Sequence, residues 1–169
     1  MLKVQGATLA QSSVSLEGTY APQQGTFTVA VTEGPYQHSR LVGNVSLAAG
    51  QRLTLKTLRL HHKDLAWENA APVEIARSPK GVLQIQRLDL RSGSQALRLH
   101  GTLDPQGPVQ AEVQVQALQL RPLVQAFAPE LSLPDGLLDL ALTVAGTMQQ
   151  PRGQGQLSLT ALQWQKRQL

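Results

Sequence analysis

The side chains best suited to metal chemistry lie close together near residue 62. His61, His62, Asp64 and Glu68 supply imidazole and carboxylate groups, the ligands that zinc and other transition metals use. The surrounding residues alternate as a β-strand does, however, and neighbouring residues of a strand point to opposite faces. The two histidines therefore cannot easily share one ion, and we predict a solvated strand end here instead of a metal site.

The sequence offers serines and carboxylates for catalysis, but none in a catalytic arrangement. There is no Gly-x-Ser-x-Gly motif, and Asp135 and Asp139 flank a strand start instead of sharing a helix face. The segment Gly153-Gln154-Gly155 precedes a strand and not a helix, so it does not match a phosphate-binding loop. The chain has no cysteine, which excludes thiolate nucleophiles and thiolate metal sites. We predict a non-enzymatic protein without catalytic residues, metal or cofactor.

Basic residues exceed acidic ones, giving a net charge of +4, but they are scattered. The nearest approach to a cluster is Arg52, Lys56, Arg59 and Lys63 along one expected strand. No aromatic residues alternate with them to stack on bases, so we predict no nucleic-acid partner.

One apolar pattern recurs four times and predicts the strands that position the side chains named above. It reads hydrophobic, any, hydrophobic, any, any, hydrophobic, any, hydrophobic, and it begins at residues 53, 83, 113 and 157. Alternation at a period of two predicts a strand with one apolar face, but the doubled spacer would send the second pair to the other face. A β-bulge inserts one extra residue, keeps all four on one face and bends the strand. We therefore predict irregular pairing at four places: Lys56-Thr57, Gln86-Arg87, Gln116-Ala117 and Thr160-Ala161.

A second repeat predicts where strands end. Gly-Thr pairs at residues 18, 101 and 146 each follow an alternating run and precede a proline and another glycine. Glycine permits a positive φ and proline cannot donate to a ladder, so we interpret each copy as a strand end, a turn and a strand start. Turn or structural roles are assigned to Gly18, Gly101, Gly146, Pro151 and Gly153. The alternating runs together predict about eleven strands.

Only one segment departs from the strand pattern. Residues 121–128 place a proline near the first turn of a helix and put Leu123 and Phe127 on one helical face. A helix of this length can plug one end of a sheet, but it is too short to cover the apolar face.

The fold must therefore bury a wide aliphatic surface without helices. Hydrophobic residues form 41% of the chain and aromatic residues only 4%, so a face built from them is smooth and aliphatic. Base rates favour a β-sandwich, in which a second sheet covers the first. The repeated kinks favour instead an all-β fold: a long curled, antiparallel-rich sheet whose aliphatic interior forms a groove. Such a groove suits acyl chains, which need apolar area more than directional hydrogen bonds.

Several segments of the C-terminal half occur in a familiar order. They are Gly101-Thr102-Leu103-Asp104, Leu120-Arg121-Pro122-Leu123, Asp135-Gly136-Leu137-Leu138-Asp139-Leu140 and Leu142-Thr143-Val144-Ala145-Gly146-Thr147, followed by residues 151–157. Over residues 80–165 this order resembles the C-terminal region of TamB, the inner-membrane subunit of the translocation and assembly module. That family is similar to AsmA-like proteins and bridge-like lipid carriers. The first 75 residues share with that family only the alternating apolar pattern.

The resemblance implies a β-taco, a curled sheet with a hydrophobic lumen that spans the Gram-negative periplasm as part of an inner-membrane-anchored protein. It implies movement of phospholipids between the two membranes or assistance to outer-membrane protein assembly. The implied partners are phospholipid acyl chains or unfolded outer-membrane protein strands, with a TamA-like outer-membrane barrel. Residues 1–169 would then form a single β-groove segment of a longer repetitive chain. The family offers no catalytic residues, and the expected groove-lining residues are Leu53, Leu55, Leu83, Ile85, Leu97, Leu99, Val113, Val115, Leu138, Leu140, Leu142, Leu157 and Leu159.

The alternative is a structural or client-strand-binding β module, either a sandwich or a solenoid, with a fully packed core. In a third interpretation the sheet edges are the functional surface, where they template the strands of a client protein.

Overall fold

The computed structural model describes residues 2–5, 12–33, 37–47, 50–62, 65–127 and 135–163. Within them lie twelve strands and one helix: β1 (Leu2–Gln5), β2 (Ser12–Ala21), β3 (Gln24–Glu33), β4 (Gln37–Ser46), β5 (Gln51–His62), β6 (Leu65–Asn69), β7 (Val73–Arg77), β8 (Leu83–Ser92), β9 (Gln95–Leu103), β10 (Pro108–Gln119), α1 (Leu120–Phe127), β11 (Asp135–Thr147) and β12 (Pro151–Gln163). The all-β class is confirmed, and α1 begins and ends one residue earlier than the helix predicted over residues 121–128.

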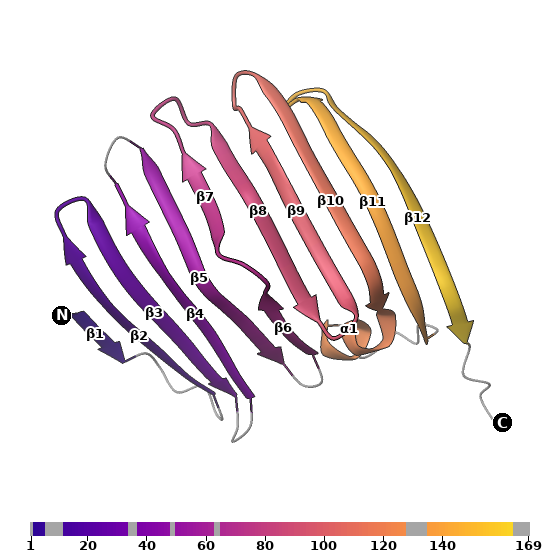
Figure 1. Ribbon diagram of the computed structural model, residues 1–169, viewed down its shortest axis with the longest axis horizontal. Coiled ribbons are helices and arrows are strands. Elements are labelled where there is room, and N and C mark those ends of the chain that lie inside the picture. The colour runs from indigo at the N-terminus through magenta and orange to yellow at the C-terminus, as the bar shows by residue number, and fades with distance from the viewer. Residues whose placement is uncertain are drawn as a thin grey trace.

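All twelve strands belong to one curled antiparallel sheet in which sequence neighbours are mostly spatial neighbours (Figure 1). The exception is the pair β6 and β7, which share one place in the sheet. β5 pairs with β6 through residues 59–62 and with β7 through residues 51–55, and both short strands then pair with β8. The path across the sheet therefore has eleven places, as many as the apolar runs predict.

The turns are made by residues that favour tight reversal. Pro22 and Gln23 join β2 to β3, with Gln23 at a φ of 72°, and Gly93 adopts a φ of 58° between β8 and β9. Before β10 the Asp104 carboxylate accepts a hydrogen bond from the Gln106 N–H at 3.0 Å, which closes an Asx turn. These connections keep successive strands antiparallel and let the sheet grow by hairpins.

All four assigned glycines lie within strands instead of in turns, and only Gly146 among them has a positive φ. Gly18 belongs to β2 and Gly101 to β9, and neither has a positive φ. A Cβ on Gly18 would stand 2.7 Å from the Thr26 carbonyl oxygen, and one on Gly101 would stand 2.6 Å from the Gln110 carbonyl oxygen. The turn expectation is corrected here: close approach of the neighbouring strand, and not reversal of the chain, requires glycine at both positions.

The other assigned residues lie around the last hairpin. Gly146 has a φ of 111° just before the turn at residues 148–150, Pro151 opens β12, and Gly153 lies within β12 opposite Val144. Helix α1 contacts β11 and also β6, so it crosses one end of the strands between them. In the described part of the chain no helix is long and apolar enough to span a membrane.

Candidate hydrophobic groove

The four apolar repeats bend where the sequence predicts irregular pairing. The register slips between Leu55 and Thr57 in β5, between Ile85 and Leu88 in β8, between Val115 and Leu118 in β10, and beyond Thr160 in β12. Two of the bulges contain a non-glycine residue with a left-handed backbone, Ala117 at a φ of 48° and Ala161 at 54°. The prediction of irregular pairing is confirmed in all four strands.

Polar side chains hold two of these bulges in place. The Asp139 carboxylate accepts a hydrogen bond from the Ala117 N–H at 2.9 Å, a group that the slip frees from the β10–β11 ladder. The side-chain carbonyl oxygen of Asn69 accepts a hydrogen bond from the Leu58 N–H at 2.7 Å, and the side-chain amide of Asn69 donates to the Lys56 backbone carbonyl at 3.2 Å. The backbone groups that these two bulges free from the ladders therefore have hydrogen-bond partners.

Because the bulges absorb the slips, the described strand residues of each apolar repeat stay on one side of the sheet, whereas Leu120, the last residue of the third repeat, begins α1. Residues that face each other across an antiparallel pair point to the same side. The register connects Leu90, Leu97, Val115, Leu140 and Leu157 in one such row across five strands. Neighbouring rows connect the remaining expected lining residues: Leu88, Leu99, Val113 and Leu142; Leu138 and Leu159; Leu83 and Leu103; Ile85 and Ile75; and, through β7, Leu53 and Leu55. We call this side the apolar face.

Exposure on the apolar face changes from the centre to the edge of the sheet. Leu55 is 8% exposed and Val115 9%, whereas Leu157 and Leu159 on β12 are 63% and 45% exposed. The other expected lining residues are half-buried. All strands of the described residues belong to the one sheet, so no second sheet lies over this face within them.

Several residues of the apolar face are not among the expected lining residues. Val73 and Ile75 face Leu55 and Leu53 across β5 and β7, and Val73 is 1% exposed. Phe27 lies between Gly18 and Gly43, and its ring fills the space over Gly43. β7 shows only the short alternation Val-Glu-Ile, which falls below the length of the four repeats, and an isolated aromatic carries no periodic signal.

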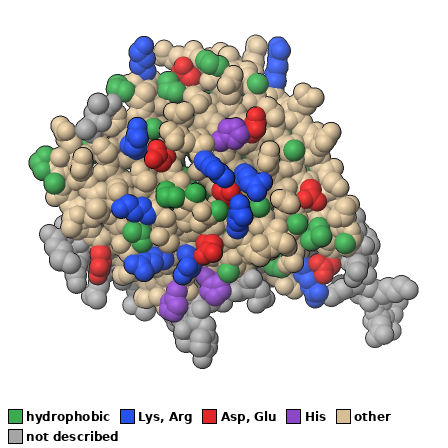
Figure 2. Space-filling view, in the orientation of Figure 1, with side chains coloured by type: hydrophobic (Ala, Val, Ile, Leu, Met, Phe, Trp, Pro, Cys, Tyr) green, Lys and Arg blue, Asp and Glu red, His purple; other side chains and the backbone are tan. Residues whose placement is uncertain are grey.

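The opposite side, which we call the polar face, carries Thr, Gln, Ser and most charged residues of the strands; Arg77, opposite Leu83 at the end of β7, lies on the apolar face. Figure 2 shows charged side chains gathered over the middle strands of this face. At their centre Asp89 is 1% exposed and lies within 3.3–3.6 Å of Arg87, Arg91 and Arg98. Burial by itself would raise the pKa of Asp89, but hydrogen bonds and positive charge from Arg91, Arg87 and Arg98 outweigh it and hold the pKa below the usual carboxyl range.

Other ion pairs on the polar face are exposed. Arg59 and Glu68 approach to 3.2 Å and Arg52 and Glu74 to 3.6 Å, with every one of these side chains more than a third exposed. Such pairs contribute little to stability in water. Two of the basic residues expected along β5, Arg52 and Arg59, therefore belong to separate ion pairs, and Lys63 lies outside the described residues.

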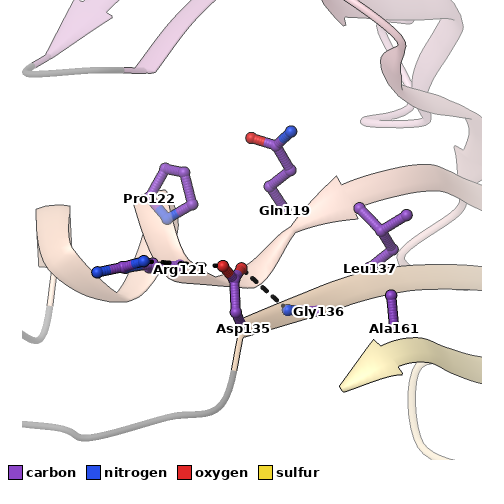
Figure 3. Close-up of a pocket in the computed structure, with 7 residues that line it drawn as sticks. All are labelled: Gln119, Arg121, Pro122, Asp135, Gly136, Leu137 and Ala161. Atoms are coloured by element: carbon purple, nitrogen blue, oxygen red, sulfur yellow. Dashed lines mark hydrogen bonds and ion pairs between the residues drawn. The ribbon is translucent and has the colours of Figure 1, made fainter. Parts of the chain in front are cut away.

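A hollow at the end of the sheet, where α1 begins, is shaped by one ion pair. Figure 3 shows Arg121 of α1 and Asp135 of β11 directed toward each other, and their charged groups lie 3.8 Å apart. Asp135 also accepts a hydrogen bond from the Gly136 N–H at 3.1 Å. The hollow lies between the helix and the sheet, and none of its lining residues is a nucleophile with an adjacent base. Its other lining residues are Gln119, Pro122, Gly136, Leu137 and Ala161.

The histidine segment is placed at the end of β5. The Ser39 hydroxyl accepts a hydrogen bond from the His61 N–H at 2.9 Å and donates to its carbonyl at 3.1 Å. Asp64 lies outside the described residues, and among those described no three His, Cys, Asp or Glu side chains gather as a metal site would require.

A family model with the description "Uncharacterized protein conserved in bacteria (DUF2125)" matches residues 3–164. No curated protein and no solved structure matches the chain.

Proposed function

The chain belongs to the bacterial DUF2125 family, and from its geometry we propose that it is a non-enzymatic conduit segment whose apolar face holds the acyl chains of phospholipids. One observation carries the proposal. A face of continuous aliphatic rows runs across a single sheet, and in the described residues only the eight-residue α1 crosses one end of it. Apolar area of this extent is stable in water only when another apolar surface covers it.

The chemistry of the face selects the class of ligand. Its rows consist of Leu, Val and Ile with few aromatic residues, and charged side chains of the middle strands project from the other face. Aliphatic side chains offer area without directional hydrogen bonds, which suits a flexible hydrocarbon chain better than a peptide or a sugar. The exposed Leu157 and Leu159 keep the apolar surface open at the β12 edge.

The bulges support the shape that such a conduit needs. Each one bends its strand while the described strand residues of its repeat keep to the apolar face, and bent strands allow a sheet to curl around such a face. The resemblance of residues 80–165 to the C-terminal region of TamB supports the same arrangement. On this proposal the segment is the periplasmic part of an inner-membrane-anchored protein. It carries phospholipid toward the outer membrane, with a TamA-like barrel as a candidate partner.

The test is direct labelling of the two faces. Phospholipid with a photoreactive diazirine in one acyl chain is incubated with the purified chain, and labelled residues are located by mass spectrometry. We expect label on apolar-face residues such as Leu99, Leu140 and Leu142, and little on the polar-face residues Gln114 of β10 and Thr143 of β11. Absence of bound lipid, or equal labelling of the two faces, would overturn the proposal.

A matched pair of variants adds a functional readout. Leu140→Arg places a charge on the apolar face, whereas Gln114→Arg places the same charge on the polar face of the adjacent strand. We expect the first variant to abolish lipid labelling and the second to retain it, with circular dichroism showing that both remain folded. Should Leu140→Arg fail to fold, the labelling pattern of the unmodified chain still decides the question.

The specific alternative is a β module with a packed core, and the burial of Val73 and Leu55 favours it for the middle of the sheet. Native mass spectrometry of the chain after expression in bacteria separates the two functions, because a fully packed core carries no lipid.

A further inference from the structure

We propose that β12 is a self-pairing edge, at which a second copy of this chain adds its own β12 antiparallel and extends the sheet across a two-fold axis. This inference does not depend on lipid binding, since it concerns the backbone edge of the sheet and not its apolar face.

The two edges of the sheet differ in how they are protected. Edge strands expose unpaired N–H and C=O groups, and proteins usually blunt them by shortness or by charged residues. β1 has four residues and includes Lys3, whereas β12 has thirteen residues, and every described side chain from Pro151 to Ala161 is exposed. From Gly153 to Gln163 the strand carries no charged residue. In the described residues no strand pairs with its outer side.

The regular part of β12 defines the centre of the pairing. Pro151 lacks an N–H, and Ala161 adopts a left-handed backbone at the bulge, so the uninterrupted segment runs from residue 152 to residue 160. The midpoint of that segment is Gln156. An antiparallel pair related by a two-fold axis at Gln156 places residue 152 opposite residue 160 of the second copy.

This register is complementary on both faces. On the apolar face it sets Leu157 opposite Gly155 of the second copy and Leu159 opposite Gly153, so each exposed leucine meets a residue without a side chain. On the polar face it sets Gln156 opposite itself and Gln154 opposite Ser158, and amides and hydroxyls can hydrogen-bond across the junction. The only charged residue, Arg152, faces Thr160, so no like charges meet. Such an isologous contact closes as a dimer.

Disulfide trapping tests both the contact and its register, because the chain has no cysteine of its own. Facing Cα atoms in an antiparallel pair lie about 4.5–5.5 Å apart, within the range of a disulfide. We expect Gln156→Cys to form a disulfide-linked dimer under mild oxidation. Gln154→Cys is the matched control, since the two copies of residue 154 would lie about 13 Å apart along the strands and cannot be bridged.

Sedimentation equilibrium of the unmodified chain and of charge variants gives the second measurement. The unmodified chain should show the mass of two chains at high concentration. Gln156→Lys sets two like charges opposite each other and should raise the dissociation constant by at least about tenfold. Gln114→Lys, on the same face of the interior strand β10, should leave it unchanged. A monomer at every concentration, open-ended polymers, or equal disulfide yields for Gln156→Cys and Gln154→Cys would each overturn the proposal.

Discussion

The two faces of the sheet are built from alternate residues of the same strands, yet they are stabilised in different ways. The apolar face consists of rows of Leu, Val and Ile that cross several strands, so its stabilisation is spread over many side chains. On the polar face the most deeply buried group is Asp89, and one network of three arginines holds it. We infer that the apolar face tolerates small losses but not charge, whereas the polar face depends on a single carboxylate.

A charge at the centre of the apolar face should have the largest effect. Val73 is 1% exposed, so Val73→Asp buries a carboxylate among aliphatic side chains without a partner. We expect a loss of about 4 kcal/mol in the free energy of unfolding, measured by urea denaturation. Gln84→Asp, on the exposed polar face, should cost less than about 0.5 kcal/mol. Similar losses for the two variants would show that the faces do not differ as described.

Removal of the central carboxylate should have an intermediate effect. Asp89→Asn leaves three guanidinium groups close together without their counter-charge, and we expect a loss of about 2 kcal/mol at neutral pH. The arginines stay partly exposed, so water screens some of their repulsion.

The same variant has a pH dependence whose sign follows from the lowered pKa of Asp89. The ionised carboxylate stabilises the folded chain fully above the pKa of the unfolded state, and this stabilisation is lost as the pH falls through the lower folded pKa. The difference in unfolding free energy between the parent chain and Asp89→Asn should therefore shrink as the pH falls below about 4. A difference that stays constant into that acid range would assign the effect to packing instead of charge.

The smallest effect should come from relaxing a bulge. Ala117 has a φ of 48°, a conformation that costs alanine more than glycine, so Ala117→Gly should raise the melting temperature through a gain of about 0.5 kcal/mol. Ala111→Gly, in the regular part of the same strand, should lower it by a similar amount, because glycine is unfavourable in a strand interior. If both substitutions lower the melting temperature, the contacts of the Ala117 side chain stabilise the fold by more than its left-handed backbone costs.

Local sequence pattern predicted much of the fold and part of the site. The doubled spacer placed the bulges at Lys56, Gln86, Gln116 and Thr160 to within a residue or two, because register slips follow directly from period-two patterning. The roles of Gly18 and Gly101 were wrong in one respect, since both lie within strands. Their requirement for glycine comes from carbonyl oxygens on the next strand, which local sequence does not display.

The side chains that hydrogen-bond to the bulges could not be predicted from the sequence either. Asp139 bonds the Ala117 N–H, and Asn69 bonds groups of Leu58 and Lys56, across separations of 22, 11 and 13 residues. Asp139 stood out in the sequence only as a carboxylate four residues from Asp135, which suggested no structural role.

The sequence by itself determined which residues share a face and where each strand must bend, because side-chain direction in a strand alternates residue by residue and depends on nothing distant. Only the tertiary structure decided which polar side chains satisfy the bulges of β5 and β10, why Asp89 is buried among arginines, and which long strand lies unpaired at the border of the sheet. Those features depend on cross-strand register, which brings together residues far apart in the chain, and register is settled only when the whole sheet assembles.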